Sequence, residues 1–388
     1  MGGLGLAATG NTMIWPEVTL IGERCLQNLG AHMKEMGSKK AVIVTDSFMC
    51  KAGVDAQIAG ILSKSGIDTV VFDGVAPNPT IEIVNNLVNI YLDQKCDSLV
   101  SLGGGSAHDT AKAVKLLIMK GNLGRSSDIV LAAVNTTAGT GSEVSKFCII
   151  TDAEKQHKLA IVNRLVVPDI AVDDPVLMVG MPPSLTAATG VDALTHSIEA
   201  YTAVDHCELT DCMAVKATEL IFKNLPICYK NGSNIKAREG MAYAAYMAGM
   251  AFSNAGLGLV HAMAHQLGGV YNLAHGVCNA VLLPFVMEFN FDINMERYAE
   301  LAQKAGLVPK GLPISVSAKN FIRMIKSMNM QLKLPQNIKT LGVREADFEM
   351  LADKALQDFS LKGNSKTAFK ADIVNLYRRA YIGENSVC

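Results

Sequence analysis

The fold class is decided by one stretch, Asp97–Leu117, which reads DSLVSLGGGSAHDTAKAVKLL. An apolar run, predicted as a buried strand, leads into the glycine-rich segment 103–106, and a helix is expected to begin near Ala107. Glycines let a backbone approach a phosphate closely, and the free N–H groups at the start of a helix stabilise the phosphate charge. The segment does not match the pattern G-x-G-x-x-G. Taken alone, a phosphate site and a tight strand-to-helix turn explain it equally well.

The same alternation of strand and helix continues on both sides of this stretch. Further strands are predicted in KAVIVTD (Lys40–Asp46), DTVVFDG (Asp68–Gly74) and DIVLAAVN (Asp128–Asn135). Strands of nearly continuous Val, Ile and Leu, separated by helices, are what a parallel sheet covered on both faces requires. The first half of the chain is therefore predicted to be α/β.

The second half is predicted to be helical. From about Pro182, Ala, Met and Leu dominate and helical spacing persists, while a segment with three prolines, Asp173–Leu185, marks the seam. A length of 388 residues suits two domains of ordinary size. We therefore expect an α/β domain over residues 1–180 and an all-helical domain over residues 181–388.

Composition excludes several classes of protein. The formal net charge is −1 and 18% of residues are charged, which argues against a nucleic-acid partner. The nine cysteines are scattered without a C-x-x-C pair, which argues against a disulfide framework and against a thiolate zinc site. No uncharged apolar run reaches the roughly 20 residues that span a bilayer, and the start lacks a basic segment followed by an apolar one. We expect a cytoplasmic protein that does not enter the membrane.

A second loop, NTTAGTGSE (Asn135–Glu143), follows a predicted strand and offers four hydroxyl groups and two glycines. Two such loops at strand ends of one parallel sheet line one crevice, and together they suit the pyrophosphate and ribose of a dinucleotide. Asp46, at the end of another strand, could bind a ribose 2′-hydroxyl and repel a 2′-phosphate. From position alone, a turn or cap role is the commoner one for such an aspartate.

Three of the eight histidines fall within GLVHAMAHQLGGVYNLAHGV, Gly258–Val277. His261 and His265 are four residues apart and share one helix face. His275 would lie about 21 Å from His261 on a continuous helix, so the two can share an ion only if the helix breaks. We expect Gly268-Gly269 to supply that break.

Asn272 and Gly276, further along the same stretch, are expected to let the chain turn back. A fourth candidate lies in GVDALTHSIEA, where Asp192 and His196 are also four residues apart. One carboxylate and several imidazoles make a mixed set suited to Fe(II), Zn(II) or Mn(II). A single histidine on an apolar face is more often a core residue, but two such pairs and a histidine in a turn favour a metal. Which three or four residues bind is open at this point.

Five motifs together resemble the iron-containing, group III alcohol dehydrogenases: GGGSAHD, TTAGTGSE, FCIITD, GVDALTHSIEAY and GLGLVHAMAHQLGGVYNLAHGVCNAVLLP. The similarity runs from about Trp15 to the end of the chain. It implies an α/β nucleotide-binding domain with a parallel sheet and an all-helical metal-binding domain, in the architecture shared with dehydroquinate synthase. It also implies NAD(H) and a divalent metal, usually Fe(II) and alternatively Zn(II), in the cleft between the domains.

The resemblance also implies roles for individual residues. The metal ligands would be Asp192, His196, His261 and His275, which leaves His265 as a proton carrier or as a group that supports the ligands. Contacts to NAD would fall on Asp46, Asn78, Gly104, Gly105, Ser106, Thr136, Thr137, Thr140, Phe147 and Lys158. The acidic residue at position 46 matches the one that accompanies NAD preference in the family.

Two departures from the family pattern bear on function. Relatives that act on diols and lactaldehyde carry Asn where this chain has Phe147, so a simple primary alcohol such as ethanol is the expected substrate, with Phe252 as a second pocket wall. Lactaldehyde, propanediols and glycerol are the alternatives. The connection from Lys120 to Asn135 is shorter than is usual, and because it neighbours the cofactor cleft we expect an effect on NAD affinity or stability.

Two other functions are weighed against this one. A dehydroquinate synthase-like lyase needs Lys and Arg in the cleft to hold a phosphorylated carboxylate, and the segments Gly190–Tyr201 and Gly258–Val277 contain neither. A protein with a structural metal site would bind metal without turning over NADH. The family suggests a homodimer or a larger homo-oligomer.

Overall fold

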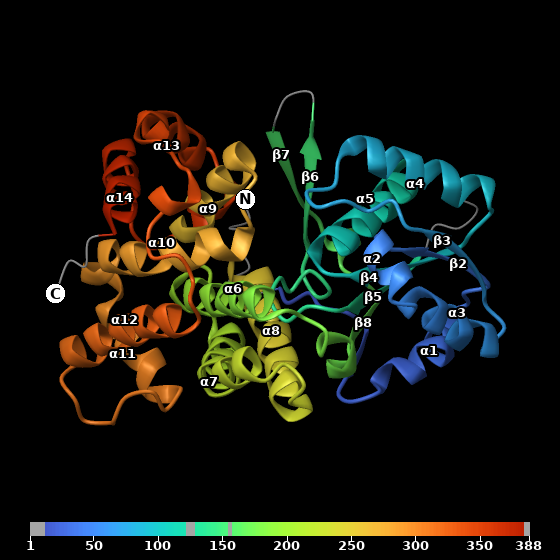
Figure 1. Ribbon diagram of the computed structural model, residues 1–388, viewed down its shortest axis with the longest axis horizontal. Helices are drawn as coiled ribbons and strands as arrows, with labels where there is room; N and C mark the ends of the chain where they lie inside the picture. The colour runs from blue at the N-terminus through green and yellow to red at the C-terminus, as the bar shows by residue number, and fades with distance from the viewer. Residues whose placement is uncertain (1–11, 122–128, 154–156, 384–388) are drawn as a thin grey trace, which may run out of the picture.

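The computed structural model describes residues 12–121, 129–153 and 157–383. An α/β part and a helical part lie side by side along the long axis of the molecule (Figure 1). Most of the shortened connection, residues 122–128, lies outside the described residues, so its predicted effect stays a prediction.

Six parallel strands form the sheet of the α/β part, in the order β1-β8-β5-β4-β2-β3. Their bounds are β1 Val18–Ile21, β2 Lys40–Val44, β3 Asp68–Phe72, β4 Ser98–Gly103, β5 Val130–Asn135 and β8 Ile170–Asp173. Gly103 and Asn135, the last residues of β4 and β5, are register partners. The two polar loops that follow these strands therefore leave the same edge of the sheet.

Helices cover both faces of this sheet, with α4 and α5 on one face and α1 and α3 on the other (Figure 1). Alternate strand residues explain why: Val42 and Leu99 pack with α4 and α5, whereas Ile43 and Val100 pack with α1 and α3. The helical segments of this part are η1 Cys25–Asn28, α1 Leu29–Glu35, α2 Ser47–Lys51, α3 Val54–Lys64, α4 Ile81–Asp93, α5 Gly105–Gly121, η2 Arg164–Val166 and η3 Pro175–Met178.

An antiparallel hairpin stands apart from the sheet and was not foreseen in the sequence. It consists of β6 Phe147–Asp152 and β7 His157–Val162. Lys112, fully buried on α5, anchors the start of this hairpin by donating hydrogen bonds from Nζ to the carbonyl oxygens of Ser145 (2.9 Å) and Phe147 (2.9 Å).

The remaining elements are helical and share one large core. They are α6 Pro183–Thr202, α7 Glu208–Lys230, α8 Ile235–Ala255, α9 Leu259–Tyr271, α10 His275–Phe289, α11 Phe291–Lys304, α12 Ile314–Gln331, η4 Lys339–Leu341, η5 Glu345–Asp347, α13 Phe348–Leu356, η6 Phe359–Gly363 and α14 Lys370–Ile382. Among the described residues no single helix is long and apolar enough to cross a membrane. The pair α10 and α11 satisfies length and composition together, but it is bent by 113°.

The predicted fold class is confirmed: a parallel sheet covered by helices is followed by a helical part. Helix α5 begins at Gly105, two residues before Ala107. One detail of the prediction is wrong, because α9 continues through Gly268-Gly269 to Tyr271. The division of the chain at residue 180 stays a prediction.

Candidate metal and nucleotide site

Four predicted ligands come together from three helices. Asp192 and His196 lie one turn apart on α6, His261 lies in the first turn of α9, and His275 is the first residue of α10. One ligand atom from each lies within 4.8 Å of the others.

Distances from the Asp192 carboxylate describe this cluster further. Its Oδ1 lies 3.5 Å from His275 Nε2, 3.8 Å from His261 Nε2 and 4.0 Å from His196 Nε2. Ligand atoms that share one ion lie about 3.4 Å apart, so these side chains, whose ligand atoms lie within 4.8 Å of one another, would have to close in to hold one.

The break between α9 and α10 brings His275 to the other ligands. It falls at Asn272, which adopts the left-handed conformation (φ 53°, ψ 37°), and not at the two glycines where we expected it. Gly276 lies inside α10, where it has a different use from the predicted turn. A Cβ there would lie 2.2 Å from the Ala188 carbonyl oxygen, so only glycine lets α10 approach α6 this closely.

Burial keeps the three histidine ligands neutral. It lowers the pKa of His196, lowers that of His275 to about 4, and places that of His261 well below its usual value. Neighbouring imidazoles add to the effect on His261. Neutral imidazole is the form that binds a metal, so the site is prepared for a cation without having to release protons from these rings.

The contacts of Asn279 show that the ligand atoms of the cluster converge on a hydrogen-bond donor. Its Nδ2 atom donates to Asp192 Oδ1 (2.6 Å) and lies 3.1 Å from Nε2 of both His261 and His275. The buried acceptors therefore converge on one electropositive amide group, as they would on a cation. Asn279 is completely buried, on α10 one turn after His275.

Glu199 supports the cluster through His261, by contacting the ring nitrogen that does not point toward Asp192. It lies on α6, one turn beyond His196, and its Oε2 is 2.6 Å from His261 Nδ1. Its Oε1 accepts a hydrogen bond of 2.7 Å from the backbone N–H of Val260. Burial raises the pKa of Glu199 to about 8, against the opposing effect of the backbone N–H groups.

His265, the predicted proton carrier, stands beside the ligands with a carboxylate of its own. Its Nδ1 lies 2.9 Å from Asp358 Oδ2, and its ring is stacked 5.3 Å from the ring of His275. Burial acts to raise the pKa of Asp358, but the hydrogen bond and charge of His265 hold it below its usual value. If Nδ1–H donates a hydrogen bond to this carboxylate, Nε2 of His265 is left for another partner.

Aromatic rings border the same place. Phe252 on α8 is stacked 4.3 Å from the His196 ring, and Phe147 at the start of β6 lies 5.7 Å from Phe252. Phe359, which the sequence analysis missed, lies 5.5 Å from Phe147 and 5.8 Å from His265. The two predicted pocket residues therefore adjoin the metal cluster, and a third ring completes the border.

The two predicted nucleotide loops touch each other. A Cβ on Gly104 would lie 3.1 Å from the Thr137 side chain, and one on Gly105 would lie 3.3 Å from that of Thr140. Thr136 donates a backbone hydrogen bond to Gly103 (3.0 Å). Ser106 lies in the first turn of α5, beside these contacts.

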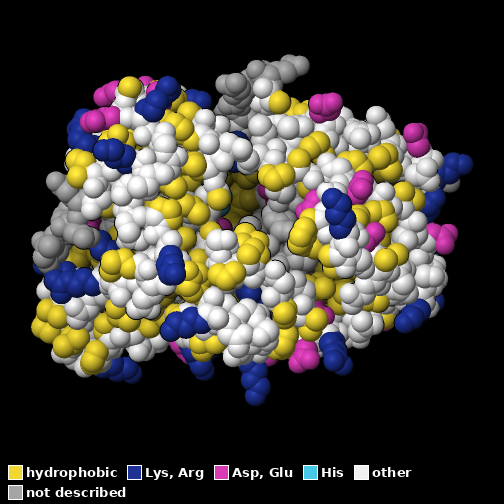
Figure 2. All heavy atoms as spheres, viewed as in Figure 1, with side chains coloured by type: hydrophobic (Ala, Val, Ile, Leu, Met, Phe, Trp, Pro, Cys, Tyr) yellow, Lys and Arg dark blue, Asp and Glu magenta, His cyan; other side chains and the backbone are white. Residues whose placement is uncertain are grey.

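The second loop also reaches the helical part. A Cβ on Gly139 would collide with Thr189 of α6, and one on Gly141 would lie 2.6 Å from Gly249 of α8. These contacts place the loop between the sheet and the helices that carry the metal cluster. Figure 2 shows the surface hollowed between the two parts, with hydrophobic side chains inside the hollow.

Asn78 and Lys158 form a separate pair of polar residues that contact each other. Lys158 Nζ on β7 donates to Asn78 Oδ1 (3.0 Å), and Asn78 Nδ2 donates to Asn272 Oδ1 (2.8 Å). The group therefore joins the α/β part to the turn that precedes His275. Burial lowers the pKa of Lys158, while Cys278 and Asp109 oppose that effect.

Asp46 follows β2, the strand that pairs with β4, and it has the cap role that its position made the commoner one. Its Oδ1 accepts hydrogen bonds from the backbone N–H groups of Phe48 (2.8 Å) and Met49 (3.0 Å) at the start of α2. Both hydrogen bonds are accepted by the same carboxylate oxygen of Asp46.

A parallel sheet with two polar loops at its edge, packed against helices that carry three histidines and an aspartate, defines a two-domain metalloenzyme of the dehydrogenase type. The chain belongs to the iron-containing alcohol dehydrogenase family. The family model for iron-containing alcohol dehydrogenase matches residues 16–175, and the model for the C-terminal part of the Fe-containing alcohol dehydrogenase family matches residues 186–381. The chain is therefore an oxidoreductase of the alcohol dehydrogenase class.

Relatives in this family are similar over nearly their whole length. The chain is 40% identical over 376 residues to the NAD-dependent methanol dehydrogenase of Bacillus methanolicus, covering 94% of this chain and 98% of that one. It is 41% identical over 377 residues to alcohol dehydrogenase 4 of Saccharomyces cerevisiae, covering 94% and 97%. The solved structure of a 1,3-propanediol oxidoreductase superposes with a TM-score of 0.91 at 39% identity, covering 96% and 100%.

Proposed function

We propose that the protein interconverts a small primary alcohol of the ethanol type and its aldehyde with NAD(H), using Fe(II) or Zn(II) held by Asp192, His196, His261 and His275. The observation that carries the proposal is the convergence of these four ligands beside a border of aromatic rings. A divalent ion held there supplies a Lewis acid that polarises a carbonyl oxygen or lowers the pKa of an alcohol hydroxyl. The set contains no thiolate, which suits iron and zinc alike.

Two features support NAD(H) as the hydride carrier. The loop around Gly104 leads into the start of α5 at the edge of the sheet, where a pyrophosphate would meet the positive end of the helix, and Thr137 and Thr140 lie beside it. Asp46 uses Oδ1 to hold α2, which leaves Oδ2 for a ribose hydroxyl and its charge to repel a 2′-phosphate. The name of the relative from Bacillus methanolicus agrees with this preference.

His265 is proposed to carry the proton that leaves or enters the substrate oxygen. Asp358 fixes its ring through Nδ1 and thereby directs Nε2 away from the carboxylate. Its ring is stacked with those of both His275 and Phe359, so it lies where the ligands meet the aromatic rings.

Phe147 supports the choice of a simple alcohol over a diol. Its ring lies between those of Phe252 and Phe359 and offers no hydrogen bond to a second hydroxyl group. A diol would therefore bury its second hydroxyl without a partner, which costs about 1–3 kcal/mol. A propanediol dehydrogenase is the second candidate, because a solved relative is named a 1,3-propanediol oxidoreductase. A cytoplasmic homo-oligomer remains our prediction.

The test compares ethanol, 1,2-propanediol and 1,3-propanediol as substrates, each by its kcat/KM with NAD⁺. We expect ethanol to be preferred, and we expect the Phe147→Asn variant to shift the ratio toward the diols by roughly tenfold, the factor that corresponds to 1.4 kcal/mol. The proposal for the substrate is wrong if either diol exceeds ethanol tenfold or more in the unchanged protein.

A further inference from the structure

Glu199 is a buried carboxylate that neither the family motifs nor the predicted site explains. It follows Asp192 and His196 along α6 at positions i+7 and i+3, so all three lie on one face of the helix. Its side chain is 6% exposed, and its two oxygens accept from different groups on α9. One of these groups is the ring of His261, and the other is the backbone of Val260.

The start of α9 has no cap of its own. Its N-cap residue is Gly258, which has no side chain to accept from the free N–H groups of the first turn. The Glu199 carboxyl group, reaching across from α6, accepts from Val260 N–H (2.7 Å), one of the free N–H groups at the start of α9. The same carboxylate therefore positions the backbone and the ring of the turn that carries His261.

We propose that Glu199 is a positioning residue that sets the metal affinity of the site. By accepting from Nδ1–H it fixes the tautomer of His261 in which Nε2 is unprotonated, and it turns that nitrogen toward Asp192 (3.8 Å). The proposal rests on the ligand set given under the proposed function. It adds a residue that touches neither substrate nor metal and acts through a ligand.

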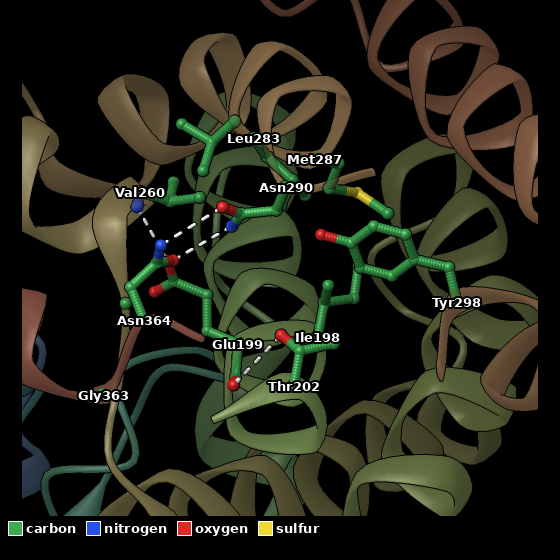
Figure 3. A pocket seen from close by; sticks show the side chains of 12 residues that line it. Ile198, Glu199, Thr202, Val260, Leu283, Met287, Asn290, Tyr298, Gly363 and Asn364 are labelled. Atoms are coloured by element: carbon green, nitrogen blue, oxygen red, sulfur yellow. Dashed lines mark hydrogen bonds between the residues drawn. The ribbon is translucent and has the colours of Figure 1, made fainter. Parts of the chain in front are cut away.

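The surroundings of Glu199 offer a matched control. Beside it lies a small cavity that is also lined by Thr202, Tyr298, Asn290 and Asn364 (Figure 3). Thr202 lies one turn further along α6, equally buried, and its hydroxyl donates to the carbonyl oxygen of Ile198. Thr202→Val therefore removes one polar group from the same cavity without touching the bond to His261.

Glu199→Gln is the informative substitution because it keeps the size of the side chain. Both oxygens of Glu199 face N–H donors, so the amide group of Gln must place its NH₂ against one of them. The bond to His261 or the cap on α9 is then lost. Loss of such a supporting carboxylate typically costs 10–100-fold in metal affinity.

The experiment titrates metal-free protein with Co(II) alone, in competition with a chelator, and records the visible absorption spectrum of the bound ion. For Glu199→Gln we expect a dissociation constant 10–100-fold higher than in the unchanged protein and an altered spectrum, while Thr202→Val stays within threefold. Circular dichroism of the metal-free forms checks that each variant is folded.

One outcome would contradict the ligand set, and another would contradict only the role of Glu199. If the unchanged protein binds no Co(II), the ligand set itself is wrong. If it binds Co(II) and Glu199→Gln binds equally well with the same spectrum, only the role of Glu199 is wrong. Should Glu199→Gln fail to fold, Glu199→Asp decides the matter. It keeps the carboxyl group but withdraws it by one methylene, and unchanged affinity in that variant contradicts the proposal.

Discussion

Glu143, at the end of the second nucleotide loop, is expected to make the protein less stable as pH rises. It is completely buried, and no other residue in the described part of the chain donates a hydrogen bond to either carboxyl oxygen. Burial raises the pKa of Glu143 to about 7, although nearby Lys112 opposes this. The group is therefore neutral in the folded protein at a pH where it is already ionised in the unfolded chain.

The sign and size of the effect follow from proton linkage. Well below pH 4.5, the ordinary pKa of this group, it is protonated in both states and contributes no pH dependence to the stability. As pH rises toward 7 the unfolded chain loses the proton first, so the folded state loses stability. Between pH 5 and pH 8.5 the loss is on the order of 2–3 kcal/mol, or about 3 °C in melting temperature for cooperative unfolding of a chain of this length.

Glu143→Gln removes this titration without changing the size of the side chain. We expect the melting temperature of the variant, relative to the unchanged protein, to rise by about 3 °C from pH 5 to pH 8.5. Differential scanning calorimetry at one scan rate measures the difference, and Glu296→Gln, an exposed position on α11, is the control. A difference that is the same at both pH values would refute the reasoning.

Two further predictions concern the site. His265→Ala should lower kcat by a factor of roughly 10²–10⁴ and leave the metal bound, because its ring contacts the ligands without being one of them; metal analysis that finds the ion lost would show that the ligand set is wrong. Asp46→Ala should weaken NAD⁺ binding and improve NADP⁺ relative to NAD⁺, and the lost cap on α2 should cost about 1 kcal/mol of stability. Isothermal titration that gives unchanged affinities for both cofactors would contradict the ribose role.

Much of the fold was predictable because its signals are local. The strands at Lys40–Val44 and Ser98–Gly103 are predicted by short runs of β-branched and apolar residues that precede polar loops. The position of the break after α9 was not predictable in the same way. Gly268-Gly269 carries the stronger breaking propensity, but a glycine inside a helix costs only about 1 kcal/mol, which tertiary packing offsets.

The site residues that the sequence did not predict fall into two groups, according to how far along the chain they lie from a predicted ligand. Glu199 and Asn279 lie at helical spacing from predicted ligands, so the pattern that selected Asp192 with His196 could have found them. Asp358 and Phe359 could not be found in this way. Asp358 is 93 residues from His265, and only the packing of η6 against α9 brings the two together.

The central claim is that the chain needs its metal to oxidise NADH with an aldehyde. The direct measurement purifies the protein without oxygen, determines its iron and zinc content, and follows NADH oxidation with acetaldehyde before chelation, after chelation, and after Fe(II) or Zn(II) is returned. We expect bound metal, loss of turnover on chelation, and recovery when one of the two ions is returned. Full turnover after complete removal of the metal would contradict the account.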